Sequence, residues 1–247
     1  MANPVKIRGN IASLTKHDES TFTVSIIPER RIPRFKAGQF LHLTLDDYDP
    51  QGGFWPESRV FSIASAPTSQ QVEIVYSVKG RYTERMRNEL AISKQLWLKL
   101  PYGEFSIDTA AAAGQDIVLV AGGTGLSPFL SYLRTILNGC LNTRRIHLLY
   151  GIRNASHLLC PEVLSACCST IKGFEMDLYV ENSADSVFAG VSQHQEMIQI
   201  KRILEIGKTM ADPAYFLSGP PIMIQTFKTG LAAAGINSKN IKVDEWE

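Results

Sequence analysis

The sequence predicts a two-domain protein, with an N-terminal antiparallel β-barrel followed by a C-terminal α/β domain built on a parallel sheet. Short alternating apolar segments, separated by Pro and Gly, fill residues 1–108, which is typical of antiparallel all-β folds. From Asp116 onward, apolar strand segments alternate with helical ones, which is typical of a parallel sheet with crossover helices. We therefore expect domains at 1–108 and 116–247, joined by a linker at 109–115.

The alternation of apolar and polar residues predicts the strands of the first half. Between Thr21 and Ile27, the side chains of Phe22, Val24 and Ile26 fall on one face, which is the period-two pattern of a half-buried strand. The same pattern predicts strands at 40–45, 72–78 and 95–100, and one helix interrupts them at about 83–91. Short strands at this spacing indicate a barrel or a sandwich.

The second half is expected to alternate between strands and helices along its whole length. The expected strands are 117–120, 145–150, 175–180, 214–217 and 241–244, and the expected helices are 128–137, 161–171, 196–206 and 222–234. Because each of the first four strands is followed by a helix, the strands are expected to run parallel.

The turn after the strand at 117–120 is the most informative local feature. The apolar run ends in Gly122-Gly123-Thr124-Gly125, and Pro128 stands where a helix begins. Glycines allow a sharp turn and a close approach of a ligand to the backbone. Amides at a helix start, with the helix dipole behind them, suit a phosphate diester. Alone, this turn indicates only a nucleotide-binding α/β domain.

Composition excludes several classes of protein. The chain has 247 residues, of which 45% are hydrophobic and 20% charged, and its formal net charge is +1. This is globular composition, and the charge gives no electrostatic reason to expect nucleic acid or an anionic membrane as a partner. The N-terminus does not resemble a signal peptide, and no apolar stretch reaches spanning length. We therefore expect a soluble protein without a membrane span.

The four cysteines, Cys140, Cys160, Cys167 and Cys168, form no CxxC pair. Three of them could be imagined as a metal cluster with His157, but the helix expected at 161–171 favours cysteines that act as small buried hydrophobes. We therefore expect no metal site. Free thiols also favour a reducing, cytoplasmic location.

Five short motifs follow one another along the chain. They are Arg59-Val60-Phe61-Ser62, Gly80-Arg81-Tyr82-Thr83, Gly122-Gly123-Thr124-Gly125, Gly219-Pro220-Pro221-Ile222-Met223, and the C-terminal Asp244-Glu245-Trp246. In this order they resemble the signatures of the ferredoxin–NADP reductase superfamily, in which an FAD-binding barrel precedes a nicotinamide-binding domain. The resemblance covers almost the whole chain and implies FAD as cofactor and NAD(P)H as electron donor.

For the first half, the resemblance implies a flavin site. Arg59 would neutralise the pyrophosphate through its fork of donors, and the amides at 81–84 would hold the same phosphates. Phe61 would face the ribityl chain or the isoalloxazine, and the Ser62 hydroxyl would hydrogen-bond flavin N5. The further flavin-binding candidates are Val60, Tyr76, Val78, Gly80, Tyr82 and Thr83.

Ordinary structural roles stay open for three of these residues. Arg59 could instead form a surface salt bridge, Phe61 could pack in the core, and Thr83 could cap the helix, alone or while binding phosphate.

For the second half, the resemblance implies a nicotinamide site at the carboxyl ends of the strands. Its candidate residues are Gly122, Gly123, Thr124, Gly125, Pro128, Arg153, Gly219, Pro220, Pro221 and Met223. Ser218 occupies the position at which the family commonly has a cysteine, near the carbon that gives up the hydride.

The C-terminus resembles the family's acidic-x-aromatic ending. Asp244 would lie near the redox centre, and Trp246 would stack on the isoalloxazine and move aside for the nicotinamide. Together with Ser62, these two residues are the candidate catalytic residues. The alternative is a frayed tail with a hydrophobic anchor.

Two residues bear on the choice of coenzyme. Arg153 stands where NADPH-dependent relatives often place an arginine, although relatives that use NADH carry one there too. Glu181 follows the strand at 175–180, where an acidic side chain would repel a 2′-phosphate. NADH is therefore slightly favoured.

The expected function is transfer of hydride from NAD(P)H to FAD, and then of electrons to a separate acceptor such as ferredoxin, flavodoxin, an oxygenase component or a cytochrome. A separate acceptor is expected because the cysteines lack iron–sulfur spacing. A basic cluster, Arg30, Arg31, Arg34 and Lys36, could dock an acidic carrier or be a solvated loop. The alternatives are a free-flavin reductase and a non-catalytic docking subunit of a larger complex.

Overall fold

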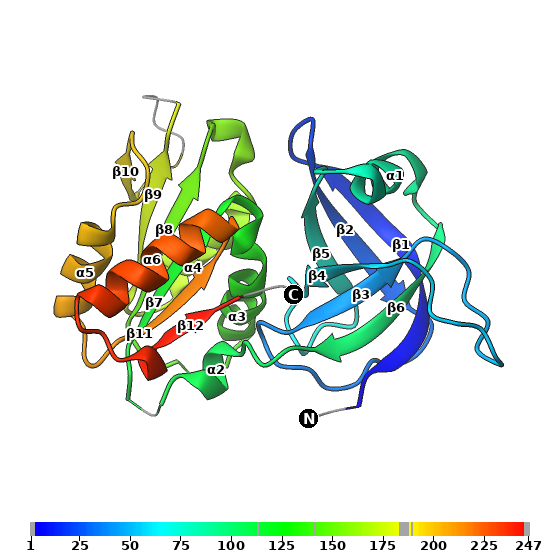
Figure 1. Cartoon of the computed structure of the whole chain (residues 1–247), viewed down its shortest axis with the longest axis horizontal. Helices are drawn as coiled ribbons and strands as arrows, with labels where there is room; N and C mark the ends of the chain where they lie inside the picture. Colours follow the sequence, from blue (N-terminus) through cyan, green and yellow to red (C-terminus); the bar gives the residue numbers. More distant parts are fainter. Residues whose placement is uncertain (1–2, 113, 141, 183–187, 189, 245–247) are drawn as a thin grey trace.

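The computed structural model describes residues 3–112, 114–140, 142–182, 188 and 190–244. Two six-stranded sheets lie side by side, and helix α3 (Ser127–Leu137) lies between them (Figure 1). Among the residues described, no helix has the length and apolar character needed to cross a bilayer.

The first sheet is antiparallel, with strand order β4-β3-β6-β1-β2-β5. Its strands are β1 (Val5–Lys16), β2 (Thr21–Pro28), β3 (Phe40–Thr44), β4 (Arg59–Ser62), β5 (Val72–Ser77) and β6 (Gln95–Tyr102). The edge strands β4 and β5 contact each other, so the sheet curls into a nearly closed barrel. Helix α1 (Arg81–Glu89) follows β5. The barrel core is formed by inward-facing residues such as Val24, Ile26, Leu41, Leu98 and Met86.

The second sheet is parallel, with strand order β10-β9-β8-β7-β11-β12. Its strands are β7 (Ile117–Gly122), β8 (Ile146–Ile152), β9 (Phe174–Val180), β10 (Ser192–His194), β11 (Ala214–Ser218) and β12 (Ile241–Val243). The helices are α2 (Ile107–Ala110), α3, α4 (Pro161–Thr170), α5 (Ile200–Lys208) and α6 (Pro221–Ala233), and the 3-10 turns are η1 (Gly123–Leu126), η2 (Ala155–His157) and η3 (Ser238–Asn240). The predicted combination of an antiparallel barrel and a parallel α/β domain is confirmed.

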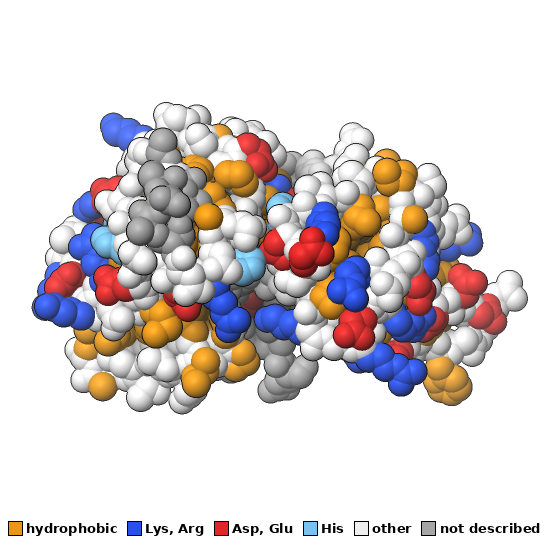
Figure 2. Space-filling view, turned by 90° about the horizontal axis from the view of Figure 1, so that it is seen from above, with side chains coloured by type: hydrophobic (Ala, Val, Ile, Leu, Met, Phe, Trp, Pro, Cys, Tyr) orange, Lys and Arg blue, Asp and Glu red, His pale blue; other side chains and the backbone are white. Residues whose placement is uncertain are grey.

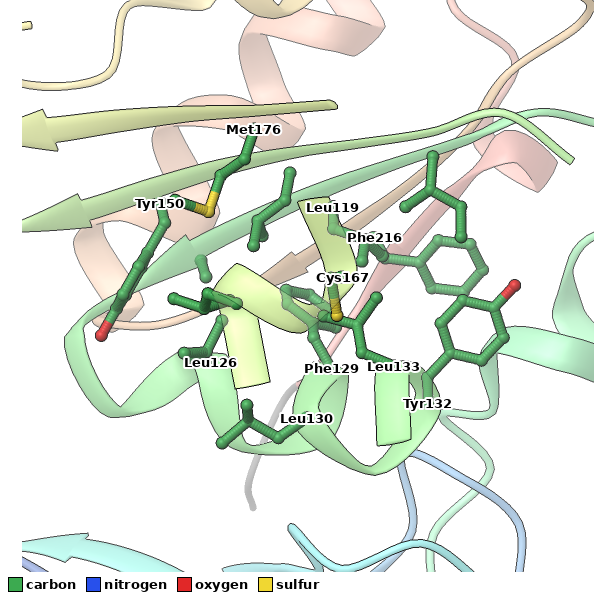
Figure 3. Packing of buried hydrophobic residues seen from close by; sticks show 14 of the residues in the cluster. Leu119, Leu126, Phe129, Leu130, Tyr132, Leu133, Tyr150, Cys167, Met176 and Phe216 are labelled. Atoms are coloured by element: carbon green, nitrogen blue, oxygen red, sulfur yellow. The ribbon is translucent and has the colours of Figure 1, made fainter. Parts of the chain in front are cut away.

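Apolar side chains cover both faces of the parallel sheet. On one face, Leu126, Phe129 and Leu133 of the η1–α3 segment pack on the strands and on Cys167 of α4 (Figure 3). On the other face, α5 and α6 cover a second cluster that includes Val118, Val120 and Leu217. Because both faces are buried, the strands are nearly continuous apolar runs, as is usual for parallel sheets.

The structure differs from the predicted elements in several places, one of which is strand β4, which was not predicted. Strand β1 was not predicted, because Gly9 and Asn10 interrupt its apolar pattern, and pairing with both β2 and β6 holds it in the sheet. The short edge strand β10 was also missed. Helix α5 begins at Ile200 rather than 196, because Ile198 packs near Gly151 in an extended segment. The short helix α2 ends inside the expected linker.

Charged side chains of both signs are distributed over the surface. Lys and Arg side chains are interspersed with Asp and Glu side chains on the face shown in Figure 2. Within the predicted basic cluster, Arg30, Arg31, Arg34 and Lys36 are exposed, and Arg30 donates a hydrogen bond to the carbonyl of Lys6 at 3.1 Å.

Candidate functional site

The glycine turn lies at the carboxyl end of β7, where open α/β sheets bind ligands. Gly123 has φ +54 and a Cβ placed there would meet no heavy atom within 4 Å, so this part of the turn is open. Thr124 is half-buried, and its carbonyl accepts a hydrogen bond of 2.8 Å from the Ser127 hydroxyl. Pro128 is buried in the first turn of α3, so it sets the start of the helix and faces the protein interior.

The two outer glycines of the turn are explained by the protein's own packing. A Cβ at Gly125 would lie 2.3 Å from the Ser218 carbonyl oxygen, and one at Gly122 would lie 2.8 Å from Sδ of Met223. The close packing of the β11–α6 segment therefore explains why these two positions are glycines. A close approach of ligand to backbone remains available at Gly123.

The β11–α6 segment begins with Gly219, whose φ of +154 favours glycine. Pro220 caps α6 and Pro221 opens it, and both are exposed. A Cβ at Gly219 would lie 2.6 Å from Cε of Met223. The segment and the glycine turn thus form one packed rim at the end of the sheet.

Three polar residues from three different elements meet between the barrel and this rim. Ser62 ends β4, Ser218 ends β11 and Asp244 follows β12, and their exposed fractions are only 6%, 2% and 4%. The Ser218 hydroxyl donates to Oδ2 of Asp244 at 3.0 Å. Burial raises the pKa of the Asp244 carboxyl group, and the hydrogen bonds from Ser218 and Ser62 lower it. Burial has the larger effect, so the pKa is about 7. A carboxyl group that changes its charge near neutral pH therefore lies beside two hydroxyls.

On the barrel, a cation lies against the start of a helix. The Arg59 guanidinium is centred 4.6 Å from the ring of Tyr82, the second residue of α1, and is paired with Glu57 at 2.8 Å. Its side chain is 47% exposed. Tyr82 itself is 3% exposed, and its hydroxyl donates to the Leu43 carbonyl at 2.9 Å. The ring of Tyr82 is therefore buried and lies beneath the Arg59 guanidinium.

The start of α1 has the hydrogen bonds of a capped helix. The Thr83 hydroxyl accepts from the backbone N–H groups of Lys79 at 2.8 Å and of Gly80 at 3.2 Å. A Cβ at the exposed Gly80 would meet no heavy atom within 4 Å. The helix start is therefore ordered and open to a ligand.

Aromatic rings line the barrel beside β4. Phe61 is 9% exposed and packs edge to face with Tyr76, with ring centroids 6.2 Å apart, and Tyr76 also stacks on Phe22. The buried Tyr76 hydroxyl has no hydrogen-bond partner among the described residues, and burial raises its pKa to about 12. Val60 and Val78 are half-buried. Phe61 therefore packs against Tyr76 in the barrel core.

Two residues of opposite charge follow neighbouring strands. Arg153 follows β8 and Glu181 follows β9, and both are exposed. The Asn182 N–H donates to the Arg153 carbonyl at 2.9 Å, and the Glu181 N–H donates to the Ile152 carbonyl at 3.1 Å. The backbone thus holds the two residues next to each other. Trp246 lies outside the described residues.

Sequence reasoning missed the contacts that join the two domains. Ser131 and Arg134 of α3 bind the barrel segment after β4, and His157 lies 3.7 Å from Asp18 of the β1–β2 turn. The signal that could have revealed the first contact is the spacing of polar residues in an otherwise apolar helix. The partner segment has no such pattern.

A family model described as an oxidoreductase NAD-binding domain matches residues 119–229. Among curated proteins, the electron transfer component of 2-halobenzoate 1,2-dioxygenase from Burkholderia cepacia is 26% identical over 243 residues, which cover 96% of this chain and 67% of that protein. The chain spans about two thirds or less of the length of such curated relatives.

Solved structures share the whole two-domain fold. The cytochrome P450 reductase GcoB of Amycolatopsis superposes with a TM-score of 0.80 at 19% identity, covering 98% of this chain and 70% of that one. A ferredoxin NADP+ reductase from Neisseria gonorrhoeae, solved with bound FAD and NADP, gives a TM-score of 0.72 at 19% identity and covers 98% of each chain. The chain thus shares the two-domain fold of these reductases, and residues 119–229 within it match an oxidoreductase NAD-binding domain.

Proposed function

We propose that this protein is an NAD(P)H-dependent flavin oxidoreductase that binds FAD on residues 1–108 and the nicotinamide coenzyme on residues 116–247. The observation that carries the proposal is the meeting of Ser62, Ser218 and Asp244 between the two domains. The site lies where the carboxyl ends of β7 and β11 face the end of β4. A hydride donor held by one domain and an acceptor held by the other would meet there.

The residues of the barrel fit a flavin dinucleotide. Arg59 lies over the first turn of α1, so a guanidinium and a helix N-terminus converge, and this combination suits a pyrophosphate. Gly80 leaves the helix start open. The buried Tyr76 hydroxyl would gain a partner from a polar group of the ligand. When bound, FAD supplies the chemistry of accepting a hydride and releasing electrons.

The chain's own residues would position the reactants and handle a proton. The Ser62 hydroxyl would hydrogen-bond flavin N5. Asp244, with its pKa of about 7, can hold a proton on its carboxyl group at neutral pH and exchange it with the Ser62 hydroxyl. The burial of both residues keeps bulk water away from the reacting atoms. Thr124 and the open Gly123 would hold the coenzyme, and Trp246 would cover the flavin until the nicotinamide replaces it.

The electron acceptor is proposed to be a separate protein. Relatives include the electron transfer component of a dioxygenase and a ferredoxin NADP+ reductase, which supports an oxygenase component or a ferredoxin as the acceptor. A flavodoxin or a cytochrome would serve the same chemistry.

The four cysteines are free thiols, which supports a cytoplasmic location.

An anaerobic titration of the purified protein with NADH, and separately with NADPH, tests the proposal by following the flavin absorbance. Bleaching by either nucleotide is the expected result and identifies the coenzyme. A colourless protein that oxidises NAD(P)H only after flavin is added would indicate a free-flavin reductase. A yellow protein that neither nucleotide reduces would indicate a non-catalytic subunit.

Replacing Arg59 with Ala is expected to weaken FAD binding by about ten- to a hundredfold, because a charge-assisted hydrogen bond to phosphate contributes about 1.5–3 kcal/mol. The Kd of FAD for the flavin-free protein, measured by fluorescence quenching, checks this. Arg8→Ala is the matched control, since Arg8 also pairs with a glutamate and lies over an aromatic ring, on the outer side of the barrel. Equal affinities of both variants for FAD would remove Arg59 from the site.

Replacing Glu181 with Gln is expected to raise kcat/KM for NADPH about tenfold relative to NADH. The exposed carboxylate beside Arg153 would repel a 2′-phosphate, and its removal leaves the arginine free to attract one. Steady-state kinetics with both coenzymes test this, with Glu205→Gln on α5 as the control. An unchanged ratio would show that Glu181 does not select the coenzyme.

A further inference from the structure

Helix α3 has two faces with different partners. Its apolar residues, such as Phe129 and Leu133, pack into the core of the α/β domain (Figure 3). Ser127, Ser131 and Arg134 are spaced four and three residues apart, so they share another face. Because α3 lies between the two sheets (Figure 1), that face meets the barrel.

Two side chains of α3 bind backbone carbonyls of the barrel. The Ser131 hydroxyl, which is fully buried, donates to the carbonyl of Ser65 at 2.7 Å. Nη1 of Arg134 donates to the carbonyl of Ala64 at 2.9 Å and also pairs with the carboxylate of Glu73 on β5. The Arg134 and Glu73 side chains are only 20% and 22% exposed, so solvent screens this ion pair less than a surface pair.

The bound barrel segment is itself held rigidly. The Ala64 N–H donates to the Glu73 carbonyl at 2.7 Å, and the Glu73 N–H donates to the Ser65 hydroxyl at 3.1 Å. The Ile63 N–H donates to the Gln39 carbonyl at 2.9 Å. Ser62, the residue proposed to contact flavin N5, directly precedes this segment, so a displacement of Ala64 or Ser65 would displace Ser62.

The other end of α3 is joined to the proposed coenzyme site. The helix begins directly after the glycine turn, and the Ser127 hydroxyl donates to the carbonyl of Thr124 at 2.8 Å. One rigid helix thus connects the turn that would hold the nicotinamide coenzyme with the segment that orients Ser62. It does so through hydrogen bonds that cross from one domain to the other.

We propose that Arg134 and Ser131 form an interdomain clamp that sets the distance and angle between the nicotinamide and the flavin. The clamp rests on the proposed function. Arg134 and Ser131 contact the backbone of Ala64 and Ser65 rather than the proposed flavin or nicotinamide sites, so both act as positioning residues. Hydride transfer is steeply sensitive to the separation of donor and acceptor, and a misplacement of about 1 Å can cost roughly a hundredfold in rate.

The test compares Arg134→Met and Ser131→Ala with Arg145→Met. Arg145 is the matched control, because it also binds one carbonyl, that of Thr209 at 2.8 Å, and one glutamate, Glu175 at 3.3 Å, but within a single domain. Flavin-saturated proteins are mixed with NADH in an anaerobic stopped-flow instrument. The limiting rate of flavin reduction, the Kd of NADH and the charge-transfer absorbance of the nicotinamide–flavin pair are recorded.

We expect Arg134→Met to lower the limiting rate at least about tenfold and to weaken the charge-transfer absorbance, with the Kd of NADH within about twofold of the wild type. Ser131→Ala should have a smaller effect in the same direction. Arg134→Lys, which keeps the charge but not the fork, should restore part of the rate. Glu73→Gln is a second way to remove the ion pair, and unlike Arg134→Met it leaves no unpaired carboxylate in the interface. The limiting rate of flavin reduction should fall in this variant too, which keeps the test available if Arg134→Met folds poorly.

A second measurement needs neither flavin nor activity. Scanning calorimetry of the flavin-free chain should give one cooperative transition for the wild type and for Arg145→Met, and two transitions for Arg134→Met, because the domains are then less tightly coupled.

The outcomes separate the clamp from the proposed function. A reducible wild type with unaffected rate and charge-transfer absorbance in Arg134→Met would overturn the clamp alone, as would an equal loss of rate in Arg145→Met. A wild type that neither nucleotide reduces would overturn the proposed function, and the clamp as a positioning device with it.

Discussion

Replacing Asp244 with Asn is expected to stabilise the fold by roughly 4 kcal/mol at pH 8, and to change its stability little near pH 4. Burial raises the pKa of the native carboxyl group to about 7 from an ordinary value of 3.8. The raised pKa means that the folded state favours the protonated carboxyl group. The stabilisation from this protonated group is fully present below about pH 4 and is lost as pH rises through 7. The pKa of the folded state lies about three units above that of the unfolded state, and about 1.36 kcal/mol for each unit gives the expected change in the free energy of unfolding.

Urea unfolding of the wild type and of Asp244→Asn at several pH values from 5 to 8 measures this effect. The difference between the two free energies of unfolding should grow steadily with pH. Asp47→Asn, which removes an exposed carboxylate from the β3–β4 loop, should run parallel to the wild type. If the Asp244→Asn and wild-type profiles were also parallel, the carboxyl group would not be buried between the domains as described.

Replacing Asp177 with Ala is expected to destabilise the protein by about 1.5–3 kcal/mol at pH 7, since a hydrogen bond to a charged group contributes about that much and the Arg202 side chain, which is 40% exposed, stays partly hydrated. Asp177 on β9 is 3% exposed, and its Oδ2 accepts from Nε and Nη2 of Arg202 at 3.0 and 2.9 Å. Nε2 of His147 and of His194 lie 3.5 and 4.0 Å from the same oxygen. Three side chains therefore lie against one carboxylate.

The pH dependence of the Asp177 variant should have the opposite sign to that of Asp244. Burial raises the pKa of the Asp177 carboxyl group, but hydrogen bonds from His147 and Arg202 outweigh it, and the net pKa lies below 3.8. The stabilisation is therefore present above about pH 4 and is lost as pH falls through the native pKa.

Thermal or urea unfolding at pH 7 and at pH 3 measures the loss and its decrease in acid. Glu175→Ala is the control, because Glu175 is 57% exposed and its ion pair with Arg145 is near the surface, where such pairs contribute about 0–1 kcal/mol. A loss for Asp177→Ala no larger than that for Glu175→Ala would contradict the prediction.

Most of the fold was predictable because its signals are local. The strand at 21–27 and the run before Gly122 carry their period or their apolar character in neighbouring residues, and the structure forms β2 and β7 there. Strand β1 was missed because its glycine and asparagine are tolerated only through pairing with two neighbours. The start of α5 was predicted too early because an extended segment packs Ile198 near Gly151.

For the candidate site, the sequence motifs name residues, and only the structure shows which of them lie together. The motifs identified Ser62 and Asp244, and the structure brings both to one buried cluster with Ser218. Tyr82, from the second motif, has its ring buried beneath Arg59. Whether a motif side chain faces a ligand or the core depends on packing, which a short motif does not encode.

The amino-acid sequence by itself determined the two architectures, the glycine turn at the end of a strand and the residue types available for flavin and nicotinamide. These properties depend on backbone preferences and on periodicity over a few residues. Only the tertiary structure decided that Asp244 is buried beside two serines, and that Arg134 and Ser131 join α3 to the segment after Ser62. Those contacts link residues far apart in the chain and in different domains, so desolvation and hydrogen bonding there arise only once the domains have packed together.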